Sequence, residues 1–132
     1  MSPLPKNRYR LPRLLFVVLL LCGCSKTVRP TTATVMAKEI TPRPPQVGPI
    51  TVTFRLVEKS KPVTGAGITL EGDMTHAGMA PVFGNAQEIA PGQYRGQLVL
   101  NMGGDWVVLI HAVLPNGQKI EDQVDVSAVR SN

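Results

Sequence analysis

The sequence predicts an all-β protein, an antiparallel β-sandwich of about seven short strands. From Ile50 onward, apolar and polar residues alternate with a period of two, the pattern of strands that bury one face. Turn signals such as Pro91-Gly92 separate these runs at intervals of about 8–12 residues. The chain shows no clear helical period. Short strands at this spacing indicate a sandwich of immunoglobulin-like type, which we place at residues 50–127.

The first 23 residues are typical of an export signal and do not belong to the fold. Four basic residues precede the apolar run Leu14–Leu21, which is far shorter than the roughly 20 residues of a membrane-spanning helix. The run ends in Leu21-Cys22-Gly23-Cys24, which resembles a bacterial lipobox. We therefore expect residues 1–23 to be a lipoprotein signal peptide and Cys24 to carry lipid such as palmitate. An ordinary cleaved signal with two incidental cysteines is the alternative.

Removal of this leader changes the charge and the cysteine count. The leader holds four of the 14 Lys and Arg residues and none of the nine Asp and Glu residues, so the mature chain carries ten against nine, or +1. That balance gives no reason to expect a nucleic-acid partner. With Cys24 as its only cysteine, the mature chain has neither a disulfide nor a thiolate metal site.

The expected lipid anchor places the protein in the cell envelope, tethered to a membrane that it does not span. Ser25 follows the cysteine where an inner-membrane retention signal would have an acidic residue. In a Gram-negative cell this pattern resembles that of outer-membrane lipoproteins facing the periplasm.

Residues 24–49 are interpreted as the lipidated N-terminus and a spacer. The segment is rich in Thr and Pro, and proline fixes φ and lacks an amide hydrogen, so the chain stays extended. The alternative is that Thr34–Ile40 docks on the domain as an edge strand or a short helix.

The strands follow in order after this spacer. Gly84-Asn85 and Gly103-Gly104 are expected to be turns, and Pro115-Asn116-Gly117-Gln118 is the strongest hairpin signal, with Asn-Gly suited to a type I′ turn. Roughly 80 residues can bury a modest core. The candidates for its centre are Trp106, Phe54, Tyr94 and Leu98. The strands that the alternation predicts are Ile50–Val57, Ile68–Glu71, Gln93–Leu100, Asp105–Leu114 and Lys119–Val126.

The segment Glu71–Pro81 holds the candidate metal ligands Met74, His76 and Met79. Thioether sulfur is a soft donor and imidazole a borderline one, a combination that suits copper and above all Cu(I). On a strand Met74 and His76 would share a face, and Met79 would join them only through a bulge or turn at Gly78. The alternative is that the methionines fill gaps in the core and His76 is a solvated loop residue.

Three features of this chain together resemble the YtkA-like family, kin to the periplasmic domains of FixH-type proteins. They are the Asp-Met-Thr-His-Ala-Gly-Met segment at 73–79, the Pro-Gly-Gln-Tyr run at 91–94 with Gly96, and the Gly-Asp-Trp run at 104–106. The resemblance covers about residues 50–126 and implies an exported binding or assembly module. Some members of the family travel with copper handling in oxidase assembly or metal efflux. The resemblance therefore implies a partner among envelope metal-handling or oxidase-assembly proteins.

The long apolar strand Asp105–Leu114 carries the second histidine, His111. It shares one strand face with Val107, Leu109 and Val113. This largely apolar face is the candidate partner surface of the competing hypothesis, a protein-interaction module that docks on an envelope complex and binds no metal. His111 itself is either a packed or hydrogen-bonded histidine or a fourth metal ligand, if its strand lies beside Met74–Met79. Met102 is a weaker metal candidate.

The sequence offers no signature of an enzyme. It has no nucleophile elbow, no His-Glu-x-x-His, no P-loop and no dinucleotide-binding fingerprint. The function predicted is therefore binding or transfer of copper or another soft metal by a membrane-anchored lipoprotein, with docking as the alternative.

Overall fold

The computed structural model describes residues 2–4 and 30–131. Most of the expected signal peptide and Cys24 lie outside these residues. Within them the chain forms strands and turns only, and none of it builds a helix with the length and apolar character needed to span a membrane. The strands are β1 (Thr34–Thr41), β2 (Gly48–Glu58), β3 (Lys61–Pro62), β4 (Gly67–Met74), β5 (Val82–Ala90), β6 (Gln93–Leu100), β7 (Gly104–Val113) and β8 (Lys119–Val129).

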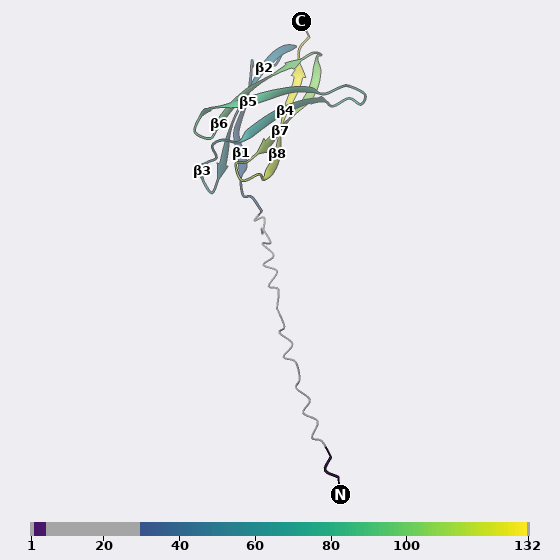
Figure 1. Cartoon of the computed structure of the whole chain (residues 1–132). Coiled ribbons are helices and arrows are strands. Elements are labelled where there is room, and N and C mark those ends of the chain that lie inside the picture. Colours follow the sequence, from purple (N-terminus) through teal and green to yellow (C-terminus); the bar gives the residue numbers. More distant parts are fainter. Residues whose placement is uncertain (1, 5–29, 132) are drawn as a thin grey trace.

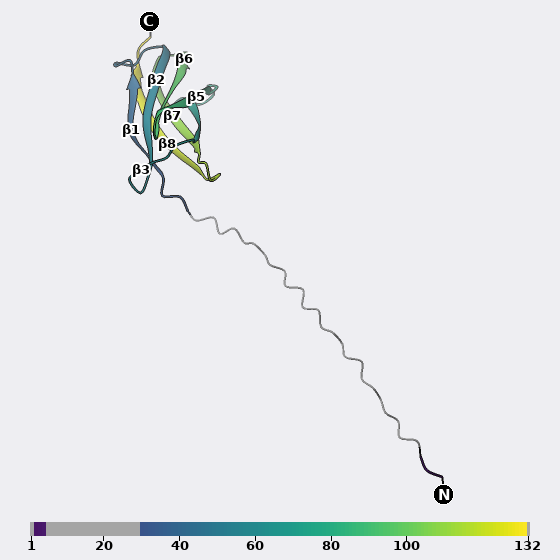
Figure 2. The same cartoon turned by 60° about the vertical axis from the view of Figure 1, so that its left-hand side comes forward.

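The strands form one hydrogen-bonded ladder in the order β1-β2-β6-β5-β4-β7-β8, with the short β3 paired to β2. Every pair of neighbours in this order is antiparallel. The ladder folds over on itself, so that β1, β2, β6 and β5 make one layer and β4, β7 and β8 the other (Figures 1 and 2). This neighbour order is that of the two sheets of an immunoglobulin constant-type domain. The predicted antiparallel, immunoglobulin-like sandwich is confirmed.

The two outermost strands, β1 and β8, come together because the ladder folds over between β5 and β4. The Lys38 ammonium lies 3.1 Å from the Asp122 carboxylate, which joins β1 to β8. Beyond β1, the Val47 amide donates to the Arg130 carbonyl at 2.9 Å in an isolated parallel bridge. These contacts cover edge groups that would otherwise be open to pairing with another chain.

Strand β1 corrects the expected domain boundary, because part of the predicted spacer 24–49 belongs to the sandwich. β1 pairs with β2 from Thr34 to Thr41. This agrees with the alternative in which Thr34–Ile40 docks as an edge strand. Between Met36 and Glu39 the register shifts by one residue, and Ala37 there has a φ of 49°. This bulge lets both Val35 and Ile40 face the core, although five positions separate them. Because the bulge interrupts the two-residue period, the sequence does not show the alternation that would identify this strand.

The core lies between the two layers and has the predicted centre. Trp106, Phe54, Tyr94 and Leu98 are all at most 1% exposed. The rings of Phe54 and Tyr94 stack with their centroids 5.7 Å apart. Among the described residues no charged side chain is buried in this core. The fold therefore rests on apolar packing across the two layers.

The hairpin predicted at Pro115–Gln118 is present between β7 and β8, but its predicted turn type was wrong, and so was the turn predicted at Gly84-Asn85. Gly84 and Asn85 lie inside β5, where Gly84 passes so close to the Gln97 carbonyl that a side chain would not fit. At the β7–β8 turn only Gly117 has a positive φ, of 83°, so the turn is not type I′. Pro115 suits the first central position of an ordinary turn, and Gly117 donates to the Leu114 carbonyl at 2.8 Å.

Candidate functional site

The Met/His segment forms the end of β4 and the loop 75–81 that leads to β5. In Figure 1 this hairpin projects from the body of the sandwich. Its base is held by the β6–β7 side of the molecule, because the Thr75 amide and hydroxyl both reach the Asp105 carbonyl, at 3.1 and 3.3 Å. Gly78 has a φ of 88°, which favours glycine and lets the loop reverse. The loop 75–81 is therefore exposed, and hydrogen bonds to β7 hold its first residue in place.

Met74 belongs to the packing of the sandwich. It is paired with Trp106 on β7 and lies half-buried against the core. A methyl group added to Gly104 would meet the Met74 Cε atom at 3.2 Å, so the end of this side chain covers the glycine. Met74 thus follows the packing alternative for this residue.

His76 and Met79 behave differently, because both are exposed on the loop. The Met79 side chain is 39% exposed. Met102 is also exposed, in the turn before β7, and its carbonyl accepts a hydrogen bond from the Trp106 indole at 3.0 Å. Since Trp106 pairs with Met74, Met102 lies at the same end of the sheet as the loop. One imidazole and two exposed thioethers therefore gather at this end.

The structure does not bring His111 to this loop. Strands β4 and β7 are neighbours, but His111 is paired with Thr69 and Met74 with Trp106. Five positions along β4 separate the two pairs, or about 17 Å at roughly 3.3 Å per residue. His111 instead points its Nε2 at Glu71 Oε2, 2.7 Å away, and its Nδ1 at Glu121 Oε2, 3.0 Å away. Its neighbours are carboxylates rather than thioethers.

The donor set at the loop allows only one kind of metal chemistry. Within residues 2–4 and 30–131, no three His, Cys, Asp or Glu side chains are grouped so that they could hold a metal ion. A metal at the loop would therefore depend on the Met79 thioether together with the His76 imidazole. Such a soft set fits Cu(I) and does not fit hard cations, which require oxygen ligands.

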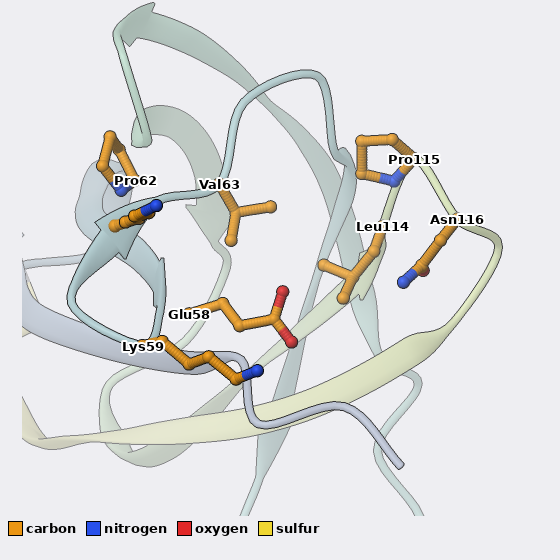
Figure 3. Close-up of a pocket in the computed structure, with 8 residues that line it drawn as sticks. Glu58, Lys59, Pro62, Val63, Leu114, Pro115 and Asn116 are labelled. Carbon is orange, nitrogen blue, oxygen red and sulfur yellow. The ribbon is translucent and has the colours of Figure 1, made fainter. Parts of the chain in front are cut away.

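A pocket of about 440 Å³ lies at the opposite end of the sandwich. Figure 3 shows the Glu58 carboxylate and the side chains of Val63 and Leu114 around this hollow. The backbone and side chain of Thr32, just before β1, both approach Glu58 Oε1 at 3.4 Å. The pocket is thus at the end where the chain enters the domain, and it contains none of the candidate metal ligands.

The predicted partner face is the outer face of β7. Val107 and Leu109 are half-buried and Val113 is 45% exposed, whereas Trp106, Val108 and Ile110 on the opposite face are buried in the core. A residue that sequence reasoning missed extends this face. Phe83 on β5 is 65% exposed and is paired with Glu71. It was overlooked because Gly84-Asn85 was expected to be a turn, although an aromatic residue followed by alternating side chains was the signal available.

No curated protein matches the chain. The structure of murine CRIg is similar over 76% of this chain and 98% of that chain, with 9% sequence identity and a TM-score of 0.43. The family model described as YtkA-like matches residues 29–111, which include strands β1 to β6 and most of β7. The chain therefore belongs to the YtkA-like family.

Proposed function

We propose that this protein is a membrane-tethered, exported module that binds Cu(I) reversibly at the β4–β5 loop and hands it to an envelope metal-handling or oxidase-assembly protein. The observation that supports this most directly is the exposure of His76 and Met79 on one projecting loop. Met79 is not among the described residues that pack against the core, so packing does not explain its place on the loop. An imidazole three positions away supplies the second donor.

Only part of the predicted ligand set takes part in this proposal. The His76 imidazole and the Met79 sulfur are the two ligands that need no rearrangement. Met74 would have to leave its place against Gly104 before its sulfur could bind, and Met102 would have to approach from the neighbouring turn. Coordination by so few ligands is weak and is open on one side, so a partner can displace them. That property suits transfer better than storage, and it requires no catalysis by this chain.

The position of the loop agrees with such a role for a lipid-anchored protein. Ten positions separate Cys24 from Thr34, a reach of at most about 35 Å in an extended chain. The chain enters the sandwich at the β3 end, whereas the loop follows the far end of β4 (Figure 1). A lipid at Cys24 would therefore hold the other end near the membrane and leave the loop open to a partner in the periplasm.

A competitive Cu(I) titration of the soluble chain Ser25–Asn132 tests this function. We expect binding of one Cu(I) that is lost in both His76→Ala and Met79→Leu. Met36→Leu is the matched control, since Met36 is also exposed but lies on β1. If the wild-type protein does not compete for Cu(I), or if Met36→Leu has the same effect as Met79→Leu, the loop is not a copper site.

A further inference from the structure

We propose that the outer face of the β4–β7–β8 layer, extended by Phe83, docks a cationic protein segment with an apolar centre. We call this surface the β7 face. Its apolar residues are Phe83, Val107, Leu109 and Val113, and its carboxylates are Glu71, Asp73, Glu121 and Asp125. At one end of the face, Val113 has the cation Lys119 as its β8 neighbour. The proposal uses none of the loop ligands and stands whether or not the loop binds metal.

Strand register places the charges directly beside the apolar residues. Val107 lies between Asp73 on β4 and Asp125 on β8. One row further, Glu71 lies between Phe83 on β5 and Leu109 on β7. Directly paired residues on one face of a sheet lie within about 5 Å of each other at Cβ. The face therefore has acidic groups on both sides of Val107 and on one side of Leu109, whose β8 partner is Gln123.

The apolar part of this face is not needed by the core of the domain. The inward side of β7 is already filled by Trp106, Val108 and Ile110, all at most 1% exposed. Phe83 leaves 65% of its surface in solvent, and exposed aromatic residues on a rigid strand are the usual anchors of protein interfaces. Exposure of this kind on the outer face of a sheet fits a partner surface better than a small ligand.

The charges determine which partner the face accepts. Glu71 and Glu121 both contact His111, at 2.7 and 3.0 Å. No hydrogen bond or ion pair within residues 30–131 engages Asp73 or Asp125. These two carboxylates, on either side of Val107, are the ones free to meet Arg or Lys side chains from outside. Arginine is the better match, because its planar guanidinium pairs with a carboxylate through two hydrogen bonds.

The same charges disfavour other occupants. A second copy docked face to face would bring the carboxylates of both chains together, and such like-charge contacts oppose association. Nucleic acid and the anionic surface of a membrane would be repelled for the same reason. A protein segment with alternating basic and apolar residues remains, since its side chains would match the rows of the sheet.

The test uses a synthetic peptide of alternating Arg and Val residues as the probe and the 15N-labelled mature chain as the target. A peptide with Glu in place of Arg is the charge control. We expect the Arg peptide to shift backbone amide resonances of β4, β7 and β8, with weaker binding at higher salt. The Glu peptide should shift none of them.

Variants then assign the surface. Phe83→Ser and the double variant Asp73→Asn, Asp125→Asn should each weaken binding at least about tenfold. Val99→Ser is the matched control, because Val99 is 59% exposed on β6 in the other layer, and it should bind as the wild type does. Equal binding of the two peptides, shifts outside the β7 face, an unchanged affinity in the double variant, or a dimer formed through this face in sedimentation would each overturn the proposal.

Discussion

The Tyr94 hydroxyl donates a hydrogen bond to the Val63 carbonyl at 2.8 Å and accepts one from the Ala66 amide at 3.1 Å. Tyr94 is the second residue of β6 in one layer, while Val63 and Ala66 lie in the connection that leads to β4 in the other layer. The Tyr94 ring is fully buried against Phe54. A core residue of one layer thus satisfies the backbone of the segment that crosses between layers.

Replacement of Tyr94 by Phe should destabilise the domain while keeping its core. The ring still packs, but the Val63 carbonyl and the Ala66 amide lose their partner. We expect the free energy of unfolding to fall by about 1–3 kcal/mol, measured by urea denaturation. Burial raises the pKa of Tyr94 above its ordinary value of 10.0. The hydroxyl's contribution should therefore be complete at neutral pH and should fail only as the pH rises beyond that value. An unchanged unfolding free energy would contradict this role.

Glu88 should make stability depend on pH in the acidic range. Its carboxylate accepts hydrogen bonds from the Gly65 amide at 3.0 Å and the Gly92 amide at 2.9 Å. These two backbone donors, Gly65 first, lower the pKa of Glu88 below its ordinary value of 4.5. Because the folded state then holds its proton less tightly than the unfolded state, the stabilisation is present above that pH and is lost as the pH falls through the lowered pKa.

The measurement for Glu88 is the unfolding free energy of the wild type and of Glu88→Gln between neutral and acidic pH. The difference between the two proteins should be constant near neutrality and should shrink on acidification. Glu58→Gln is the control variant, since Glu58 is a carboxylate that lines the pocket at the β3 end of the sandwich. A difference that grows towards acidic pH would show that the sign is wrong.

Gly84→Ala should be strongly destabilising although it adds a single methyl group. The new Cβ would collide with the backbone carbonyl of Gln97, which cannot move without disturbing β6. We expect a loss of at least about 1–3 kcal/mol in thermal or urea unfolding. Gly67→Ala is the matched control, because Gly67 also lies on a strand and nothing is within 4 Å of its added Cβ. A loss in Gly67→Ala as large as that in Gly84→Ala would contradict the close approach.

Met74 and Met79 should respond differently to truncation. Met74→Ala removes a half-buried side chain that packs beside Trp106, so we expect a loss of about 1–2 kcal/mol, below the range for full burial. Met79→Ala removes an exposed side chain and should change stability by no more than about 0.5 kcal/mol. Urea denaturation of both variants in the absence of metal makes the comparison. Equal losses would mean that Met79 also packs.

Most of β2, β6 and β7 could be predicted, because each strand buries one face and the side chains along it alternate without interruption. Phe54, Tyr94, Leu98 and Trp106 were recognisable as core residues for that reason. The sequence indicated strand β1 only as an alternative to a spacer. The bulge at Ala37 breaks the two-residue alternation, so Val35 and Ile40 do not fall on one face of a regular strand. β5 was missed because a Gly-Asn pair is typical of a turn. In the structure Gly84 is instead a strand residue that packs closely against the Gln97 carbonyl.

The candidate site could be predicted only as a set of residues. Met74, His76 and Met79 are neighbours in the chain, but the end of the strand divides them. Met74 is held by the pairing of β4 with β7, while His76 and Met79 follow in the loop. Phe83 and the acidic residues of the β7 face come from three strands, β4, β5 and β8. No pattern within a single strand could therefore predict that these residues lie close together.

The sequence by itself determined the fold class, the buried face of the long strands and the family, because these depend on the order of residues along one strand or one motif. The tertiary structure decided which strands are neighbours and in which register. That register separated His111 from Met74 by about 17 Å and placed it between Glu71 and Glu121 instead. Pairing in a sheet is settled by core packing between distant segments, so no short stretch of this chain contains it.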